Sequence, residues 1–115
     1  MIDFDKGNIT LVLVPSDLRA GFDKLSAIAL SRLNIDVSKG NDWVVFISKH
    51  RSFAKIIHAD SNGSLLISRR LNSGRFQELM TRATGPAIET ISKEELINYL
   101  NGKDLMVKRR NLLKN

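Results

Sequence analysis

One turn signal constrains this sequence more than any other feature. The tetrapeptide Asp60-Ser61-Asn62-Gly63 lies between two segments rich in aliphatic residues. Asparagine and glycine both tolerate positive backbone φ angles, so an Asn-Gly pair favours the tight turn of a β-hairpin. The flanking segments, Ala54–Ala59 and Leu65–Leu71, are therefore predicted to be antiparallel strands. The chain must build a sheet around this hairpin.

Three further segments are predicted to be strands. Ile9–Val14 is rich in β-branched and aliphatic residues and stops at Pro15, which is typical of a buried strand. Trp43–Ile47 is apolar at every position, as expected of a central strand covered on both faces, so Trp43 and Phe46 are predicted to be core residues. Ala87–Ile91 is predicted to be a short last strand.

Two helices are expected. Ser16 offers an N-cap and Asp17 an acid in a first turn, and apolar residues then recur at helical spacing at Leu18, Phe22, Leu25, Ala29 and Leu33. Gly21 would interrupt this helix at a cost of about 1 kcal/mol relative to alanine, which suggests the close approach of another backbone. Near the C-terminus, the Ser-x-x-Glu spacing from Ser92 to Glu95 is typical of a capping box before a helix that ends at Gly102.

The order of these elements predicts an α+β fold. At 115 residues the chain is long enough for one hydrophobic core and too short for two. We expect a single domain over residues 1–104, with a mainly antiparallel sheet of four to five strands, a long helix after the first strand and a C-terminal helix. Residues 73–85 are predicted to be a loop. Residues 105–115 are predicted to be a basic C-terminal tail, since they contain four cationic side chains and no acid.

Composition narrows the class of protein. No apolar run approaches the roughly 20 residues that span a bilayer, and Met1–Lys6 has no basic apolar leader, so we expect a cytoplasmic protein without membrane contact. The chain has no cysteine, which excludes disulfides and thiolate chemistry and fits a reducing compartment. Two histidines are too few for most zinc sites. We therefore expect no metal, cofactor or small-molecule substrate.

Positive charge is concentrated in one region of the chain. The formal net charge is +6, and residues 43–77 hold six cationic side chains against one acid, Asp60. Such like charges on neighbouring strands repel unless they are solvated or meet an anion, and arginine forks suit phosphate oxygens. The candidate nucleic-acid-binding residues are Lys49, Arg51, Lys55, Arg69, Arg70 and Arg75. A solvated sheet edge, where cations block aggregation, explains the same pattern.

Aromatic residues and histidines leave two further questions open. Phe53 and Phe76 adjoin the basic positions and either stack on bases or pack in the core. His58 and Asp60 share one strand face and could form an orienting pair, with His50 as a second proton carrier. No nucleophile elbow, glycine-rich phosphate loop or metal pattern completes such a site, so we expect no enzyme activity.

Two motifs resemble a known family. The pattern Asp-hydrophobic-Arg-x-Gly-hydrophobic-Asp-x-Leu matches Asp17, Arg19, Gly21, Phe22, Asp23 and Leu25, and the pattern Lys/Arg-Arg-Leu-x-x-Gly-Arg-Phe matches Arg69–Phe76, with Gly74 at its glycine. These segments are similar to the TnpB-type accessory protein (second open reading frame) of the insertion-sequence sixty-six transposon family. The sequence departs from that family at Ile57-His58, where aromatic residues are frequent, and at Lys103, where an aliphatic residue is usual.

The resemblance implies a role beside a larger transposase. We expect a non-catalytic accessory protein that assists transposition by binding element DNA at its ends, or the transposase–DNA complex, through the Lys49–Arg75 surface. The alternative is a protein-only adaptor that docks the transposase without touching DNA. The first motif also has a structural interpretation, in which Asp17 and Asp23 bond Arg19 or the hairpin arginines as a network.

Overall fold

In the computed structural model, which describes residues 7–78 and 88–105, five strands form one mixed sheet. The strands are β1 (Asn8–Val12), β2 (Asp42–Ile47), β3 (Phe53–Asp60), β4 (Gly63–Arg70) and β5 (Ile88–Ile91). Their order across the sheet is β4-β3-β2-β1-β5. β1 and β2 are parallel, whereas the pairs β1–β5, β2–β3 and β3–β4 are antiparallel. The parallel pair was not foreseen from the sequence.

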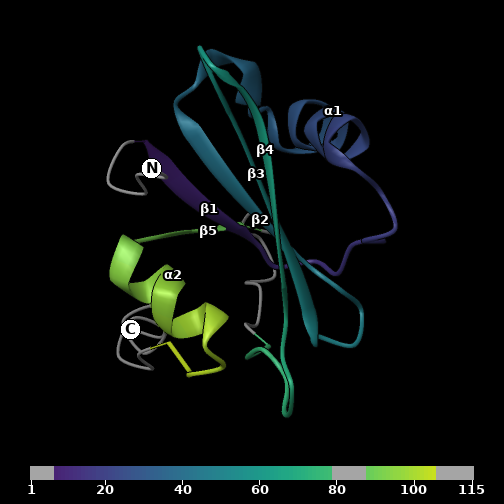
Figure 1. Ribbon diagram of the computed structural model, residues 1–115, viewed down its shortest axis with the longest axis vertical. Coiled ribbons are helices and arrows are strands. Elements are labelled where there is room, and N and C mark those ends of the chain that lie inside the picture. Colours follow the sequence, from purple (N-terminus) through teal and green to yellow (C-terminus); the bar gives the residue numbers. More distant parts are fainter. Residues whose placement is uncertain (1–6, 79–87, 106–115) are drawn as a thin grey trace, which may run out of the picture.

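One helix covers each face of this sheet, as Figure 1 shows. α1 (Phe22–Leu33) connects β1 to β2, followed by a short 3₁₀ helix, η1 (Val37–Lys39), and so forms the crossover that a parallel pair requires. α2 (Lys93–Leu100) follows β5 and lies on the opposite face. The described residues thus confirm an α+β domain, and no helix in this part of the chain is long and apolar enough to cross a membrane.

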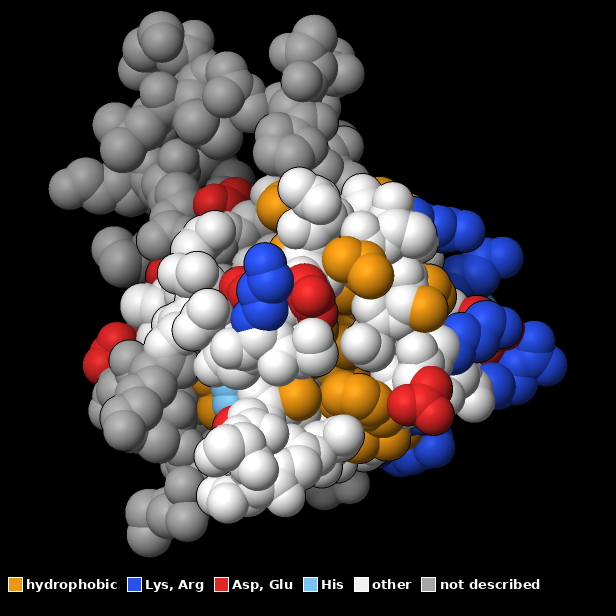
Figure 2. Space-filling view, turned by 90° about the horizontal axis from the view of Figure 1, so that it is seen from above, with side chains coloured by type: hydrophobic (Ala, Val, Ile, Leu, Met, Phe, Trp, Pro, Cys, Tyr) orange, Lys and Arg blue, Asp and Glu red, His pale blue; other side chains and the backbone are white. Residues whose placement is uncertain are grey.

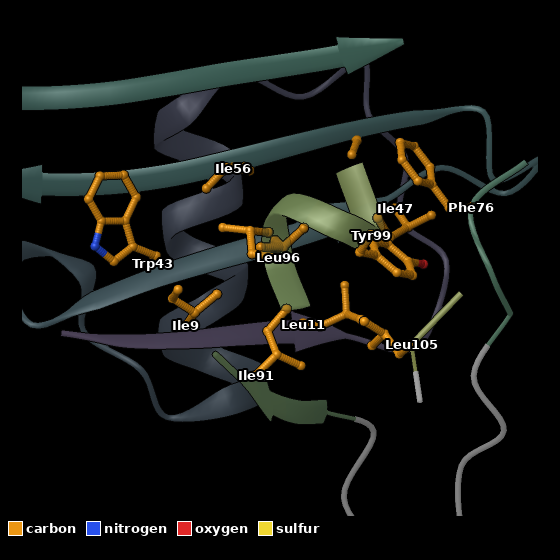
Figure 3. Close-up of a cluster of buried hydrophobic side chains, with 12 residues drawn as sticks. Ile9, Leu11, Trp43, Ile47, Ile56, Phe76, Ile91, Leu96, Tyr99 and Leu105 are labelled. Atoms are coloured by element: carbon orange, nitrogen blue, oxygen red, sulfur yellow. The ribbon is translucent and has the colours of Figure 1, made fainter. Parts of the chain in front are cut away.

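Both faces of the sheet are packed. β2 directs Trp43, Val45 and Ile47 toward α2, and Val44 and Phe46 toward α1. On the α2 face, Leu96 lies between Ile9 and Ile56 (Figure 3). On the α1 face, Leu25 and Ala29 are fully buried. The fully apolar run at Trp43–Ile47 is therefore a central strand, as predicted.

The hairpin has the predicted turn, and the structure supplies its register. Asp60 pairs with Gly63 and closes a two-residue turn. The Asp60 carboxylate accepts hydrogen bonds from the backbone N–H groups of Asn62 (2.8 Å) and Gly63 (3.2 Å). The side chain of Asp60 thus stabilises the turn that the Asn-Gly pair permits.

The first helix begins later than predicted. α1 starts at Phe22, and residues from Ser16 to Gly21 form a loop. The cause is local: Asp17 Oδ1 accepts the backbone N–H of Arg19 at 3.1 Å, which offers this segment an alternative to helical hydrogen bonds. Ser16 N–H donates instead to the carbonyl of Ile47 at 2.9 Å, beside the end of β2.

Gly21 also differs from its prediction. It is the N-cap of α1, its φ is −91°, and a Cβ placed there would meet no atom within 4 Å. The expectation that another backbone approaches Gly21 is therefore wrong.

The C-terminal helix agrees with the capping box. Ser92 Oγ accepts the N–H of Glu95 at 3.1 Å, and Ser92 N–H donates to Glu95 Oε1 at 2.9 Å. Leu105, the first residue of the predicted tail, is buried against the α2-side core. Residues 106–115, like much of the loop predicted at 73–85, lie outside the described residues.

Candidate functional site

An open hollow of about 880 Å³ lies where the loop after β1 meets the loop between β2 and β3. Three separate parts of the chain meet there because Ser16 pairs with Ser48 in parallel, beyond the end of the β1–β2 ladder. The hollow is lined by Pro15, Ser16, Asp17, Leu18, Arg19, Ser48, Lys49, His50, Phe53 and Arg70. Three of these side chains are permanent cations.

Arg70 reaches the hollow from the end of β4. It pairs with Phe53 across the hairpin, and its guanidinium carbon lies 5.1 Å from the centre of the Phe53 ring. This distance is typical of a cation–π contact. Phe53 is half-buried in the α1-side core, so the ring supports Arg70 at the surface rather than presenting a free stacking platform.

Lys49 and His50 come from the loop between β2 and β3, and both are exposed. Neither Lys49 nor Arg70 forms an ion pair with another described residue. Their charges therefore face solvent at the rim of the hollow, where an anion can reach them.

Arg19 is held by a neighbouring acid. Its Nε donates to Asp17 Oδ1 at 3.1 Å and its terminal nitrogen to Asp17 Oδ2 at 2.8 Å. The side-chain hydrogen bonds from Arg19, followed by the bond from its backbone N–H, hold the pKa of Asp17 far below its usual range. The same carboxylate raises the pKa of Arg19. Asp17 thus fixes the Arg19 guanidinium, whose side chain remains 91% exposed.

The structural network predicted for the first motif is present in part. Asp17 bonds Arg19, as that interpretation proposed. Asp23 lies in the first turn of α1, where the helix dipole favours an acid, and forms no ion pair with the other described residues.

Lys55 does not line the hollow, but it contacts the loop after β1. Its Nζ donates to the carbonyl oxygen of Ala20 at 2.8 Å, from a partly buried position on β3. This bond ties the loop that carries Asp17 and Arg19 to the sheet. Lys55, predicted as a nucleic-acid-binding residue, therefore has a structural partner.

Arg69 lies on the opposite face of the sheet from Arg70. It pairs with Ala54, which packs in the α2-side core. Its Nε donates to the carbonyl of Leu100 at 3.1 Å and its terminal nitrogen to Asn101 Oδ1 at 2.7 Å. Because a cation at the C-terminus of a helix satisfies free carbonyls and complements the dipole, Arg69 caps α2.

Arg51 and Arg75 also lie outside the hollow. Arg51 adopts a positive φ of 58°, its guanidinium lies 3.6 Å from Glu78 Oε1, and its Nε is buried without a described hydrogen-bond partner. It lines a small cavity of about 30 Å³ beside Tyr99 instead. Arg75 is exposed in the loop after β4. The six predicted cations are thus divided between two faces and two loops.

Much of the second motif is structural. Phe76 is buried and stacks on Tyr99, with ring centres 5.3 Å apart (Figure 3). Gly74 has a φ of +73°, which favours glycine. Leu71 N–H donates to the carbonyl of Ser52 and Phe76 N–H to that of Arg51, so the motif is tied to the loop between β2 and β3. Core packing, one of the two interpretations of Phe76, is confirmed.

His58 and Asp60 do not face each other as a pair. His58 is buried and stacks on Trp43 with ring centres 3.8 Å apart, and its Nδ1–H donates to the carbonyl of Asp42 at 2.8 Å. Asp60 is engaged in the hairpin turn. Each side chain thus has a separate structural partner.

Figure 2 looks onto the end of the molecule that carries the hairpin turn. The visible lysine and arginine side chains gather mainly on the side of α1, and apolar side chains are exposed nearer the turn. Phe53 and Arg70 belong to the same α1 side. The hollow itself lies at the other end of the hairpin, where β3 begins and β4 ends, and faces away from this view.

Lys49 and Arg70 were predicted from the sequence as candidate nucleic-acid-binding residues, and the structure brings both to the hollow together with Arg19. Arg19 was predicted as a motif residue, not as a binding residue. The missing signal was the parallel pairing of β1 with β2, which brings the loop after β1 against the loop after β2. That pairing joins residues far apart in the chain and leaves no local trace in the sequence.

Comparison with known proteins gives one family. A protein-family model described as "IS66 Orf2 like protein" matches residues 7–110. The "Uncharacterized protein y4hO" of Sinorhizobium fredii (strain NBRC 101917 / NGR234) is 36% identical over 89 residues, which are 77% of this chain and 74% of that protein. No solved structure matches the chain.

Proposed function

The chain belongs to the IS66 Orf2-like family of insertion-sequence accessory proteins, and from that premise we propose that it assists transposition by binding the phosphate backbone of element DNA. The contact surface is the hollow, with Arg19, Lys49 and Arg70 as the phosphate-binding side chains. The proposed role is that of a binding protein, not of an enzyme.

The observation that supports this proposal is the convergence of three cations on one open hollow. Asp17 pairs with Arg19 in the same hollow, so Lys49 and Arg70 are the two lining cations without an acidic partner among the described residues, and both attract an anion. Phosphate oxygens accept bidentate hydrogen bonds from arginine, and they are attracted by the compact positive charge of the lysine ammonium group. His50, at the same rim, can donate a further hydrogen bond.

The arrangement favours contact with the backbone over reading of bases. Asp17 fixes Arg19, and the Phe53 ring supports Arg70, so both guanidinium groups are positioned before a ligand arrives. The cations come from two loops and a strand end, and no helix carries them into a groove. Backbone contacts set position and affinity but carry little sequence information. We therefore expect weak discrimination between element ends and other duplexes.

The test is fluorescence-anisotropy binding of the full chain to an element-end duplex and to a scrambled duplex across a salt series. Lys49→Gln/Arg70→Gln removes two cations from the hollow. Its matched control, Lys39→Gln/Lys103→Gln, removes two exposed cations elsewhere. The hollow variant should lose about tenfold in affinity and lower the salt slope by about 2, because each phosphate contact contributes about 0.9 to that slope.

Two outcomes oppose the proposal. Equal losses in both double variants would mean that only the net charge matters. Salt-tolerant binding to the transposase, with no affinity for duplex DNA, would favour the alternative role of a protein-only adaptor.

A further inference from the structure

The hollow has an apolar wall that contact with a DNA backbone does not explain. Pro15, Leu18 and Phe53 line it beside the cations, and Pro15 is exposed while Phe53 is half-buried. A base-paired duplex stacks its bases inside and presents phosphates and sugars along its backbone. Those groups use the charge of the hollow and leave its wall without a partner. A volume of about 880 Å³ with apolar walls and few polar groups is typical of a pocket for a small molecule.

Arg70 joins the charged and the apolar parts of the hollow. Its guanidinium carbon lies 5.1 Å from the centre of the Phe53 ring, so its charge is held beside the apolar wall. An arginine binds phosphate through its N–H groups and can also stack its planar guanidinium on a base. A nucleotide whose phosphate binds Arg70 therefore has an apolar surface within reach of its base.

The charge of the hollow suits a terminal phosphate better than a phosphate within a strand. Its lining holds three permanent cations and one acid, Asp17, so two positive charges remain unbalanced when His50 is neutral. A phosphate that joins two nucleotides carries one negative charge, whereas a terminal phosphate carries about −1.5 to −2 at pH 7. Lys49 and Arg70, which have no acidic partner among the described residues, can neutralise both charges. His50 at the rim can donate a hydrogen bond to a further oxygen.

We propose that the hollow holds the end of a DNA strand, with the terminal phosphate between Lys49 and Arg70 and the adjoining unpaired nucleotide against Pro15 and Phe53. This inference rests on the proposed function and names the form of DNA that the same surface prefers. A paired nucleotide must leave the base stack before it can enter the hollow, whereas an overhanging nucleotide is already free. The preferred ligand is therefore a phosphorylated overhang, the structure that a staggered cut through both strands creates.

The test is fluorescence-anisotropy binding of the full chain to three duplexes of one sequence. The first has blunt ends, the second has short single-stranded overhangs that end in hydroxyl groups, and the third has the same overhangs with terminal phosphates. Overhangs of both polarities are tested. In at least one polarity the terminal phosphate should tighten binding about tenfold, because charged hydrogen bonds to phosphate are stronger than neutral ones. The hydroxyl overhang should bind more tightly than the blunt duplex, since its base reaches the apolar wall.

One pair of variants tests the charged part of the hollow. Lys49→Gln/Arg70→Gln should abolish the gain from the terminal phosphate, because it removes the two cations without an acidic partner. Lys39→Gln/Lys103→Gln loses the same charge away from the hollow and should retain the gain.

A second pair tests the apolar wall without changing the charge. Pro15→Ser shortens the wall and should weaken binding of the overhangs about threefold while leaving the blunt duplex unchanged. Val14→Ser truncates the neighbouring apolar side chain, which is 51% exposed and does not line the hollow, so it should change neither affinity. Circular dichroism checks that both variants fold.

The outcomes separate this inference from the proposed function. Binding of the blunt duplex that requires Lys49 and Arg70, with no gain from an overhang or its phosphate, would overturn the inference and leave the proposed function standing. A gain that persists in Lys49→Gln/Arg70→Gln would place the strand end elsewhere on the protein and overturn the inference as well. Equal effects of Pro15→Ser and Val14→Ser would remove the base from the apolar wall. No affinity for any of the duplexes would overturn both proposals.

Discussion

Neighbouring residues of the same type have different roles in this protein. Arg69 and Arg70 are adjacent, yet Arg69 caps α2 on one face and Arg70 lines the hollow on the other. Strand alternation alone separates them, because successive side chains point to opposite faces. The sequence shows how many cations lie in residues 43–77, but only the pairing register shows on which face of the sheet each strand cation lies.

We predict that Arg69→Met and Arg70→Met have opposite phenotypes. Arg69→Met removes two hydrogen bonds at the end of α2 and should lower the free energy of unfolding by about 1 kcal/mol. Arg70→Met should change stability less and weaken duplex binding more. Urea unfolding followed by the fluorescence of the single tryptophan, Trp43, measures the first effect, and anisotropy measures the second. The same phenotype in both variants would contradict the division of roles.

Tyr99 gives a prediction on pH. Burial raises the pKa of Tyr99 to about 12, and its hydroxyl donates to the carbonyl of Gln77 at 2.8 Å. Because the folded-state pKa lies above the unfolded value of about 10, the neutral hydroxyl contributes stability that is complete below pH about 10 and is lost as pH rises toward about 12.

The single tyrosine of the chain makes this shift directly measurable. Tyrosinate absorbance should titrate near pH 12 in the folded protein and near pH 10 in urea. Tyr99→Phe should be less stable at neutral pH, since it loses a hydrogen bond, but should lose less stability from pH 9 to about 11 than wild type. Coincident titrations in the folded and unfolded states would contradict the burial argument.

At the scale of elements, the strands were more predictable than the first helix. β1 and β2 are rich in apolar residues, and the Asn-Gly turn marks the two hairpin strands, so local sequence suffices to find these four strands. The start of α1 was misplaced because Asp17 bonds the N–H of Arg19 and holds the segment in a loop. Leu18 is buried although it lies outside the helix, so the helical spacing of apolar residues continues through this loop. The spacing therefore did not indicate where α1 begins.

That loop leads to a prediction for Lys55. Lys55→Met keeps the length of the side chain but removes the bond to Ala20, so it should cost about 1–2 kcal/mol of stability. Hydrogen exchange should also become faster in residues 16–21. Lys49→Met, which loses no described hydrogen bond, should leave both quantities unchanged. Equal effects of the two substitutions would show that Lys55 does not tether the loop.

At the scale of the whole molecule, a sheet covered on both faces leaves only its edges and ends for partners. The hollow lies at the end where the loops after β1 and β2 meet, and the β4 edge runs beside it through Arg70. Composition indicated the positive charge, and the Asn-Gly turn indicated the hairpin. The site itself depends on the parallel pairing of β1 with β2, which no local pattern encodes.

The central claim is that the hollow contacts the phosphate backbone, and the most direct measurement is a map of the bound surface. A duplex would be titrated into isotope-labelled protein while the backbone amide resonances are followed by NMR. We expect the largest shifts at Arg19, Lys49, His50 and Arg70, on the α1 side, with little change at Arg69 and the end of α2. Shifts centred on Arg69 and Arg75, or none at DNA concentrations that saturate binding, would contradict the account.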